Sequence, residues 1–239
     1  MFGLGTLINA LAIVAGGILG LLFGRHLQQR HQDSLTRVCG ICTLFIGIGG
    51  ALEGMLSVSS GSVTSGGSLL IIGCLALGAL VGELLNIENQ IERFGKWLRD
   101  KSGNSNDKQF INGFVTASLT VCIGAMAVVG AIEDGLLGDI SILLTKSILD
   151  LIIITVMTCS MGKGCIFSAV AVLLFQGSVT ALSFLIKPLM TDAALGNLSM
   201  IGSILIFCVG INLVWDKRIR VANMLPAIVL AVAAAFLPF

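Results

Sequence analysis

The chain has 239 residues, of which 56% are hydrophobic and only 11% are charged, and its formal net charge at pH 7 is +1. A soluble domain carries roughly 25% charged residues, so this chain cannot cover a water-facing surface and its solvent must be largely lipid. The near-zero net charge gives no basis for nucleic-acid binding. The start, MFGLGTLIN, lacks the basic segment of a removable signal peptide, so we expect it to begin a transmembrane helix.

Eight apolar segments follow one another along the chain, and most reach the ~20 residues that a hydrocarbon layer requires. They are residues 3–23, 38–57, 68–86, 110–132, 139–160, 165–187, 197–215 and 221–238. The sequence therefore predicts an all-α polytopic membrane helix bundle with eight transmembrane helices, organised as one transmembrane domain over residues 1–239.

The basic residues predict the orientation of these segments. Twelve of the 14 follow the first, third, fifth and seventh segments: Arg25, Arg30, Arg37, Arg93, Lys96, Arg99, Lys101, Lys108, Lys163, Lys217, Arg218 and Arg220. The alternate connections hold only Lys187, and Lys146 lies within a segment. Because basic residues are retained on the cytoplasmic side, we expect both termini to lie outside.

The first two hairpins, residues 3–57 and 68–135, resemble each other and predict an internal repeat. The corresponding runs are Gly16-x-x-x-Gly20 with Gly78-x-x-x-Gly82, Thr43-Leu-Phe-Ile-Gly47 with Thr120-Val-Cys-Ile-Gly124, and Gly50-Ala-Leu-Glu53 with Gly130-Ala-Ile-Glu133. Both copies run out–in–out, so the repeat is parallel, and the remaining helices occupy 139–239. Repeats are common in transporters, but gene duplication also produces structural bundles.

Glycine is abundant, with 30 residues, many of them spaced by four. This spacing lets helix backbones approach closely in lipid, within one chain or across the interface of a homo-oligomer. The run Gly47-Ile-Gly-Gly50 is also compatible with a locally unwound helix whose carbonyl groups face a cavity. We expect packing at this run.

Residues 87–99 have the pattern of an amphipathic helix. Ile87, Ile91, Phe94 and Leu98 recur on one face, and charged residues fill the other. Such a helix is typical of the membrane interface, here on the predicted cytoplasmic side.

The predicted outer face is acidic: Glu53, Glu133, Asp134 and Asp139, with Asp192 in the next outer loop, stand against the single Lys187. It also includes an uncharged loop at 57–67 that we expect to be flexible. Two interpretations are open. The carboxylates can form a vestibule that concentrates cations, or an ordinary solvated rim in which Asp139 caps a helix.

The segment at 139–160 carries Lys146 and Asp150 in its interior, on one helix face. An ionisable group at membrane depth costs at least ~2.5–3.5 kcal/mol, so a partner or a water-filled cavity must offset that cost. The pair is either a mutual ion pair that locks this helix to its neighbours or part of a transport path.

Four other polar residues are expected at membrane depth: Asn9, Glu83, Gln176 and Asn212. Together with Lys146 and Asp150 they can form one polar core on facing helices, although an isolated amide more often bonds a neighbouring helix. Our leading hypothesis is a transporter or channel for an ion or small solute, with its path near the pair. The alternative is a non-transporting membrane scaffold or a partner subunit of a membrane complex.

Enzyme motifs are absent, and we expect no catalytic site, cofactor or metal. The histidines, His26 and His31, lie in the first predicted cytoplasmic loop. The spacing Cys39-x-x-Cys42 suits a metal or redox pair, but it has no second pair and no adjacent histidine, so packing is the better interpretation.

Several runs resemble a bacterial inner-membrane family of unknown function, domain of unknown function 554. They are GTLINALAIVAGGILGLLFG, CIGAMAVVGAIEDGLLGD, KSILD, FQG and GINLVWDKRIRVANMLPA, and the likeness spans essentially the whole chain. The resemblance implies a multi-pass protein of the bacterial cytoplasmic membrane. It supplies no substrate, catalytic residue or cofactor.

Overall fold

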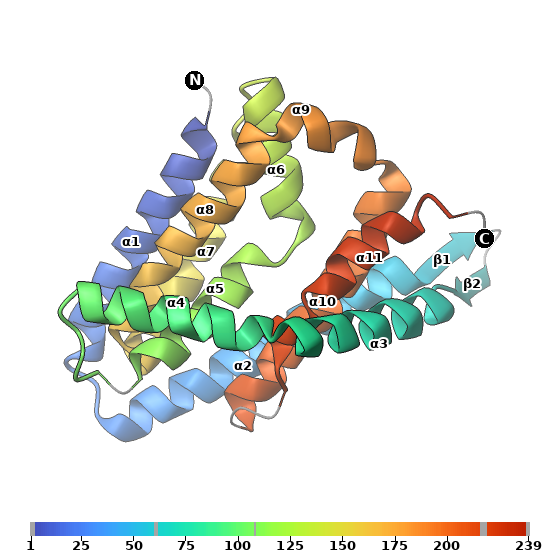
Figure 1. Ribbon diagram of the computed structural model, residues 1–239. Helices are drawn as coiled ribbons and strands as arrows, with labels where there is room; N and C mark the ends of the chain where they lie inside the picture. Colours follow the sequence, from blue (N-terminus) through green and yellow to red (C-terminus); the bar gives the residue numbers. More distant parts are fainter. Residues whose placement is uncertain (1–2, 60–61, 108, 216–218, 238–239) are drawn as a thin grey trace.

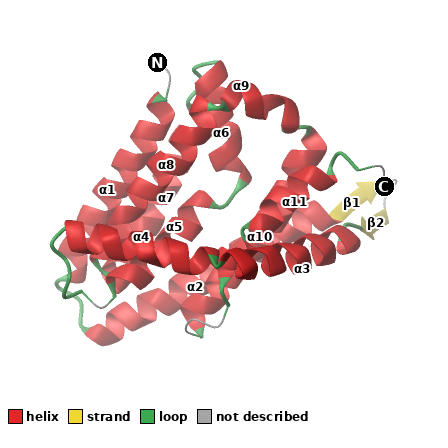
Figure 2. Cartoon of the chain, viewed as in Figure 1, coloured by secondary structure: helices red, strands yellow, loops and turns green. Residues whose placement is uncertain are grey.

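The computed structural model describes residues 3–59, 62–107, 109–215 and 219–237, which form a helix bundle with one short hairpin (Figure 1, Figure 2). The α-helices are α1 (Leu4–Gly24), α2 (Gln29–Met55), α3 (Ser68–Leu85), α4 (Ile87–Lys101), α5 (Phe110–Cys122), α6 (Ala125–Leu136), α7 (Ser141–Met161), α8 (Ser168–Ala181), α9 (Ser183–Ile186), α10 (Asp192–Val214) and α11 (Pro226–Ala234). Three 3₁₀ helices are η1 (Lys163–Phe167), η2 (Lys187–Leu189) and η3 (Val221–Met224). Lys108, Lys217 and Arg218, used in the orientation prediction, lie outside the described residues.

Within the described residues, six helices are long and apolar enough to cross a membrane: α1, α2 from Arg30, α3, α7, η1 with α8, and α10. The helices α5 and α6 meet the same criterion only as a pair, which is bent by 65°. The predicted eighth segment forms a shorter apolar helix, Val221–Ala234. The polytopic all-α fold is therefore confirmed, with six spans, or seven if the bent pair is one span; eight spans remain a prediction.

The helices pack in two groups. In Figure 1 α1, α7 and α8 lie on the left, α3, α10 and α11 lie on the right, and α2 runs from the lower left to the right, contacting α7 on its way. The first group is α1, α7 and α8, in which α1 packs along α7. The second group is α2, α3, α10 and α11, in which α2 packs along α10 and α3 packs on α11. The bent pair α5–α6 contacts α7 and α8 of the first group and α10 of the second. It therefore lies at the junction of the two groups.

Glycine accounts for the closest helix approaches. A Cβ added at Gly16 of α1 would lie 2.5 Å from the carbonyl oxygen of Leu151 on α7. One added at Gly47 of α2 would lie 2.6 Å from the backbone nitrogen of Phe207 on α10. The α2 helix is continuous from Gln29 to Met55, so the run beginning at Gly47 packs and is not unwound. These contacts lie within one chain and do not test a homo-oligomer.

The segment predicted as a single helix over 110–132 is instead broken after Cys122. Gly124 has φ 145° and ψ 152°, a backbone conformation available almost only to glycine. The helix α6 then begins at Ala125 in a new direction. The prediction of one helix failed because the composition is apolar on both sides of the break. Apolar composition carries no information about the backbone angles of a single residue.

The segment 57–67, predicted as a flexible loop, forms most of a hairpin. Strands β1 (Leu56–Ser59) and β2 (Ser62–Ser65) pair antiparallel, with Val58 opposite Val63 and the Ser57 and Thr64 hydroxyl oxygens 2.9 Å apart. Composition rich in serine and glycine indicated flexibility, but alternating Val and Thr residues favour a paired strand.

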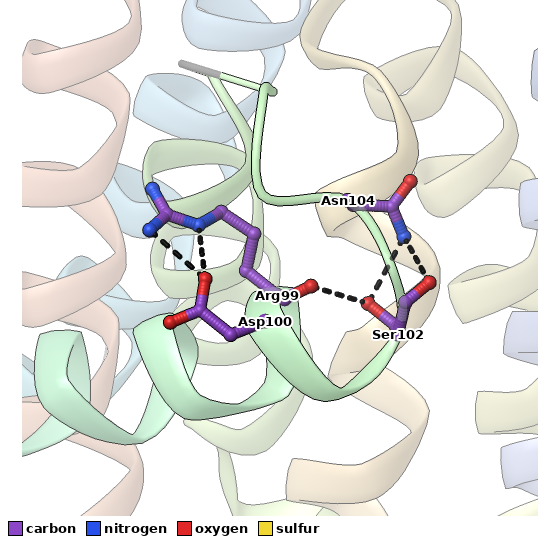
Figure 3. Close-up of polar contacts among 4 residues, drawn as sticks. All are labelled: Arg99, Asp100, Ser102 and Asn104. Carbon is purple, nitrogen blue, oxygen red and sulfur yellow. Dashed lines mark hydrogen bonds and ion pairs between the residues drawn. The ribbon is translucent and has the colours of Figure 1, made fainter.

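The amphipathic helix is confirmed as α4, which follows α3 across the front of the view in Figure 1. Its apolar face packs on protein: the Phe94 and Phe114 rings are 5.9 Å apart, and Leu98 is 8% exposed. At its end, the Arg99 guanidinium donates to Asp100, and Asn104 donates to the Ser102 hydroxyl at 2.9 Å (Figure 3). Placement of α4 in a membrane interface stays a prediction.

Candidate functional site

The buried ion pair lies near the middle of α7. Lys146 Nζ and Asp150 Oδ2 are 2.6 Å apart, and the two residues are 7% and 3% exposed. Both lie on the face of α7 that packs against other helices, because Leu143, Ser147 and Ile154 are buried on the same face. Each charge is therefore removed from lipid and neutralised by the other.

Two neighbouring helices bring amide side chains to this pair. Asn9 of α1 and Gln176 of α8 are both 0% exposed, and the Asn9 amide donates to Gln176 Oε1 at 3.3 Å. The Asn9 side chain also interacts with the Asp150 carboxylate. Among the described residues, Asn9 Oδ1 and Gln176 Nε2 have no hydrogen-bond partner. The polar cluster therefore comprises Asn9, Lys146, Asp150 and Gln176, with one acceptor and one donor unused.

The break in the α5–α6 pair lies beside this polar cluster. The charges of Lys146 and Asp150 both act on the thiol of Cys122, the last residue of α5. On the other side, a Cβ added at Gly202 of α10 would lie 3.4 Å from the Ile123 side chain and 4.0 Å from the Gly124 nitrogen. The broken backbone therefore lies against α10 on one side, and α5 and α6 pack on α7 on the other, where the two helix groups meet.

A helix break exposes backbone polar groups. A helix end leaves some backbone groups without partners in its own helix. At this break the Leu119 carbonyl oxygen accepts from the Ile123 N–H at 3.1 Å, and the Gly124 carbonyl oxygen accepts from the Ala127 N–H at 3.2 Å. In a membrane, backbone groups without such partners are tolerated only when they are buried in protein or line a cavity. The break thus ends two helices that both pack on α7, the helix of the buried pair. Interrupted helices occur at the ion and substrate sites of many transporters.

Three cavities lie toward one end of the bundle, and two of them are lined by the last turn of α5, at Leu119 and Thr120. That end, the basic end, carries Arg25, Arg99, Lys163 and Arg220. Cavities of about 460 and 270 Å³ share the lining residues Thr36, Asn112, Met161 and Leu213. A third, of about 110 Å³, is lined by Leu213 as well as by Thr43, Thr120, Ile153 and Met157. None of these three cavities is lined by Lys146 or Asp150, although Ile153 lies within one turn of Asp150.

Two of the residues predicted for the polar core lie elsewhere. Glu83 is exposed near the end of α3 and accepts a hydrogen bond from Arg220 at 3.0 Å. Asn212 lines the cavity of about 460 Å³ and bonds Ile219, accepting from its N–H at 2.9 Å and donating to its carbonyl oxygen at 2.7 Å. The hydrogen bonds of Glu83 and Asn212 thus go to partners other than the pair, and their part in a path stays a prediction. Hydropathy gives a residue's approximate depth but not the direction in which its side chain points.

The four predicted rim carboxylates do not form one exposed surface. Asp134 is 1% exposed, and its Oδ2 accepts from the backbone N–H groups of Gly5 at 3.0 Å and Thr6 at 3.4 Å, where α1 begins. Glu53 is exposed at the end of α2, which lies far from the end of α6 in Figure 1. The sequence prediction placed Asp134 on an exposed rim because its burial depends on N–H groups at the start of α1, which is far away in the sequence.

The other two rim residues flank the turn into α7. Glu133 is half-buried and lines a cavity of about 180 Å³ together with Lys187. Asp139 is exposed, and its carboxylate accepts from the hydroxyl of Ser141 at 2.7 Å and from the backbone N–H of Ser141 at 2.9 Å. These hydrogen bonds lower the pKa of Asp139 below its ordinary value, because they favour the charged carboxylate. Asp139 thus orders the start of α7.

The sequence interpretation missed the residues of the break. The one available signal was the pairing of Gly124 with Gly47, because local unwinding is one of the two interpretations of the run that begins at Gly47. Thr120 to Gly124 had been matched with Thr43 to Gly47 in the predicted repeat. In the structure, Gly47 packs within a continuous helix whereas Gly124 breaks one. The two matched glycines therefore serve different purposes, and the repeat itself stays a prediction.

Comparisons with known proteins place the chain in a family. Residues 4–236 match the model of DUF554, described as a protein of unknown function. The uncharacterized protein YqgA of Escherichia coli (strain K12) is 30% identical over 232 residues, covering 95% of this chain and 94% of that protein. The uncharacterized membrane protein YdfK of Bacillus subtilis (strain 168) is 29% identical over 232 residues, covering 97% of this chain and 95% of that protein. No solved structure matches significantly. The chain is a polytopic membrane protein that belongs to the DUF554 family.

Proposed function

We propose that this protein is a membrane transporter for a small solute, with its site at the polar cluster beside the break between α5 and α6. One observation carries the proposal: the helix pair α5–α6, which packs on α7, is interrupted, and α7 carries a buried Lys–Asp pair. An uninterrupted helix would satisfy its own backbone groups and pack well without any functional demand. Breaking one beside two ionised groups concentrates polar atoms that a membrane otherwise disfavours.

The arrangement of the helix groups supports alternating access. The bent α5–α6 pair contacts both groups, so a movement of one group against the other alters the surroundings of the break. Toward the basic end, two cavities are lined by the last turn of α5. At the other end, Asp134 joins α6 to the start of α1, and the Thr6 and Thr180 hydroxyl oxygens lie 3.3 Å apart between α1 and α8. These contacts support a conformation in which access to the break is closed at that end and open toward the basic end.

The second candidate function is a non-transporting scaffold or partner subunit. The close contact between Lys146 and Asp150, and the absence of either residue from the three cavity linings, favour it. On this interpretation the pair only joins α7 to its neighbours. Transport is preferred because a scaffold gives no reason for the break at Gly124 or for buried amide atoms without partners.

A flux screen tests the proposal. Purified protein is reconstituted into liposomes, and the movement of monovalent cations, monovalent anions and small neutral metabolites is followed against protein-free liposomes. We expect saturable flux of at least one class. Protein that is folded and correctly inserted, yet moves none of them above the control rate, would contradict transport and leave the scaffold as the better conclusion.

A further inference from the structure

The buried charges restrict what the site can hold. Lys146 and Asp150 neutralise each other at 2.6 Å, in a region from which water is largely excluded. An uncompensated charge in such a place costs several kcal/mol. An ion that binds alone would make the site charged, so any ionic ligand has to arrive with a compensating charge. A metal cation is further disfavoured because the Lys146 ammonium lies at the centre of the site.

The unused hydrogen-bonding atoms point to the kind of ligand. Gln176 Nε2 is a donor and Asn9 Oδ1 is an acceptor, and both are fully buried without a partner among the described residues. A buried donor or acceptor without a partner destabilises a native protein unless something binds it. Their positions are tied to the pair, because Asn9 bonds Gln176 and interacts with Asp150. The site therefore lacks one acceptor for Gln176 and one donor for Asn9.

We propose that this polar cluster binds one small monovalent anion together with one proton. The anion takes the place of the Asp150 carboxylate on the Lys146 ammonium and accepts a hydrogen bond from Gln176 Nε2. The proton adds to the Asp150 carboxylate, and the resulting carboxylic acid donates to Asn9 Oδ1. Empty and loaded sites are both neutral, and the loaded site uses both of the atoms that otherwise lack partners.

Few other ionisable groups can take part. Among the described residues, Lys146 is the charged group that acts on Asp150, and Cys122 of α5 is the other titratable group on which both charges act. Elsewhere on the elements that pack against α7, Asp134 of α6 lies at the start of α1. Cys39 of α2 interacts with Cys159 and with Cys165 of η1, toward the basic end. Asp150 is thus the group placed to receive the proton.

The inference rests on the proposed function, whose substrate class it names: the protein would carry an anion and a proton together, without net charge movement. Binding and flux are nevertheless separate measurements. Purified protein in a weakly buffered detergent solution is titrated with chloride, nitrate, formate and lactate, and proton uptake is followed with a pH indicator. We expect one proton to be taken up per anion bound, so the dissociation constant rises tenfold for each pH unit above the pKa of the group that takes up the proton.

The variant Asp150→Asn gives a second readout. It mimics the protonated carboxyl and leaves the Lys146 ammonium without its partner, so it should be less thermally stable than the wild type in anion-poor buffer. Millimolar concentrations of the bound anion should restore its melting temperature, and its anion affinity should not change with pH. Asp100→Asn is the control, because it removes the partner of Arg99 at an exposed site. It should show no such restoration.

Two results would overturn the inference. One is the binding of an anion without proton uptake; the other is a failure of all four anions either to bind the wild type or to restore Asp150→Asn. These results are distinguishable from a failure of transport. Coupled binding with no flux of any solute would retain the site and remove the transporter, whereas flux of a neutral solute without anion binding would do the reverse.

Discussion

Gly124 is the residue on which the shape of the candidate site depends most directly. Its φ of 145° is unfavourable for any side chain, while a Cβ at this position would have open space within 4 Å. We therefore expect Gly124→Ala to lower the free energy of unfolding by about 1–3 kcal/mol through backbone strain alone. The measurement is thermal unfolding in detergent, followed by the fluorescence of Trp97 and Trp215.

The control for this prediction is Gly177→Ala. Gly177 lies inside α8 and also has open space around an added Cβ, but its backbone is helical. It should be neutral or slightly stabilising, because alanine favours a helix by about 1 kcal/mol over glycine. Equal melting temperatures for the two variants would mean that the break is not a strained, glycine-dependent feature.

The charged pair makes a prediction that separates loss of one partner from loss of both. Asp150→Asn alone should destabilise by about 3–5 kcal/mol, because it leaves a buried lysine without a counter-charge. Replacing both residues, as Lys146→Met with Asp150→Leu, should recover most of that loss. A double variant no more stable than Asp150→Asn, measured by the same thermal unfolding, would show that the pair contributes more than mutual neutralisation to folding.

At the scale of helices, the α1–α7 contact depends on the absence of side chains. A Cβ at Gly16 would lie 2.5 Å from the Leu151 carbonyl oxygen, and that backbone atom cannot move independently of α7. Gly16→Ala should therefore separate the two helices and cost about 1–3 kcal/mol. Gly73→Ala on α3, where nothing lies within 4 Å of the added Cβ, is the matched control and should cost nothing. Similar melting temperatures for both variants would contradict this packing.

Asp134 links α6 to the start of α1 and makes a second helix-scale prediction. Asp134→Ala removes the acceptor for the Gly5 and Thr6 N–H groups and should cost about 0.5–2 kcal/mol, as the loss of a helix cap does. Asp134→Asn keeps a carbonyl oxygen that can accept from the same N–H groups, so it should retain most of the stability. Equal losses in both variants would indicate that the charge, and not the hydrogen bonding, is needed.

The positions of helices could be predicted from the sequence because long apolar runs report lipid contact directly. The ranges of α1, α3, α7 and α10 differ from the predicted segments by a few residues. The buried pair could be predicted because charge inside an apolar run is conspicuous. The break at Gly124, the cap by Asp134 and the positions of Glu83 and Asn212 could not. Each depends on one residue's backbone angles or on a partner far away in the chain.

For the whole molecule, the orientation in the membrane follows from the basic residues and can be tested by labelling. In a variant without the seven native cysteines, single cysteines are placed at Leu137 and Ser105, which are both exposed. We expect an impermeant thiol reagent outside intact cells to modify the cysteine at 137 and not the one at 105. Labelling of the cysteine at 105 alone would reverse the predicted orientation.

The central claim is that a solute path uses the charged pair beside the break. The most direct test compares flux through the wild type and the Lys146→Met, Asp150→Leu variant in proteoliposomes, after both are shown to have similar melting temperatures. We predict that the variant moves the solute carried by the wild type no faster than protein-free liposomes do. A well-folded variant with full wild-type flux would contradict the claim and reduce Lys146 and Asp150 to a structural ion pair.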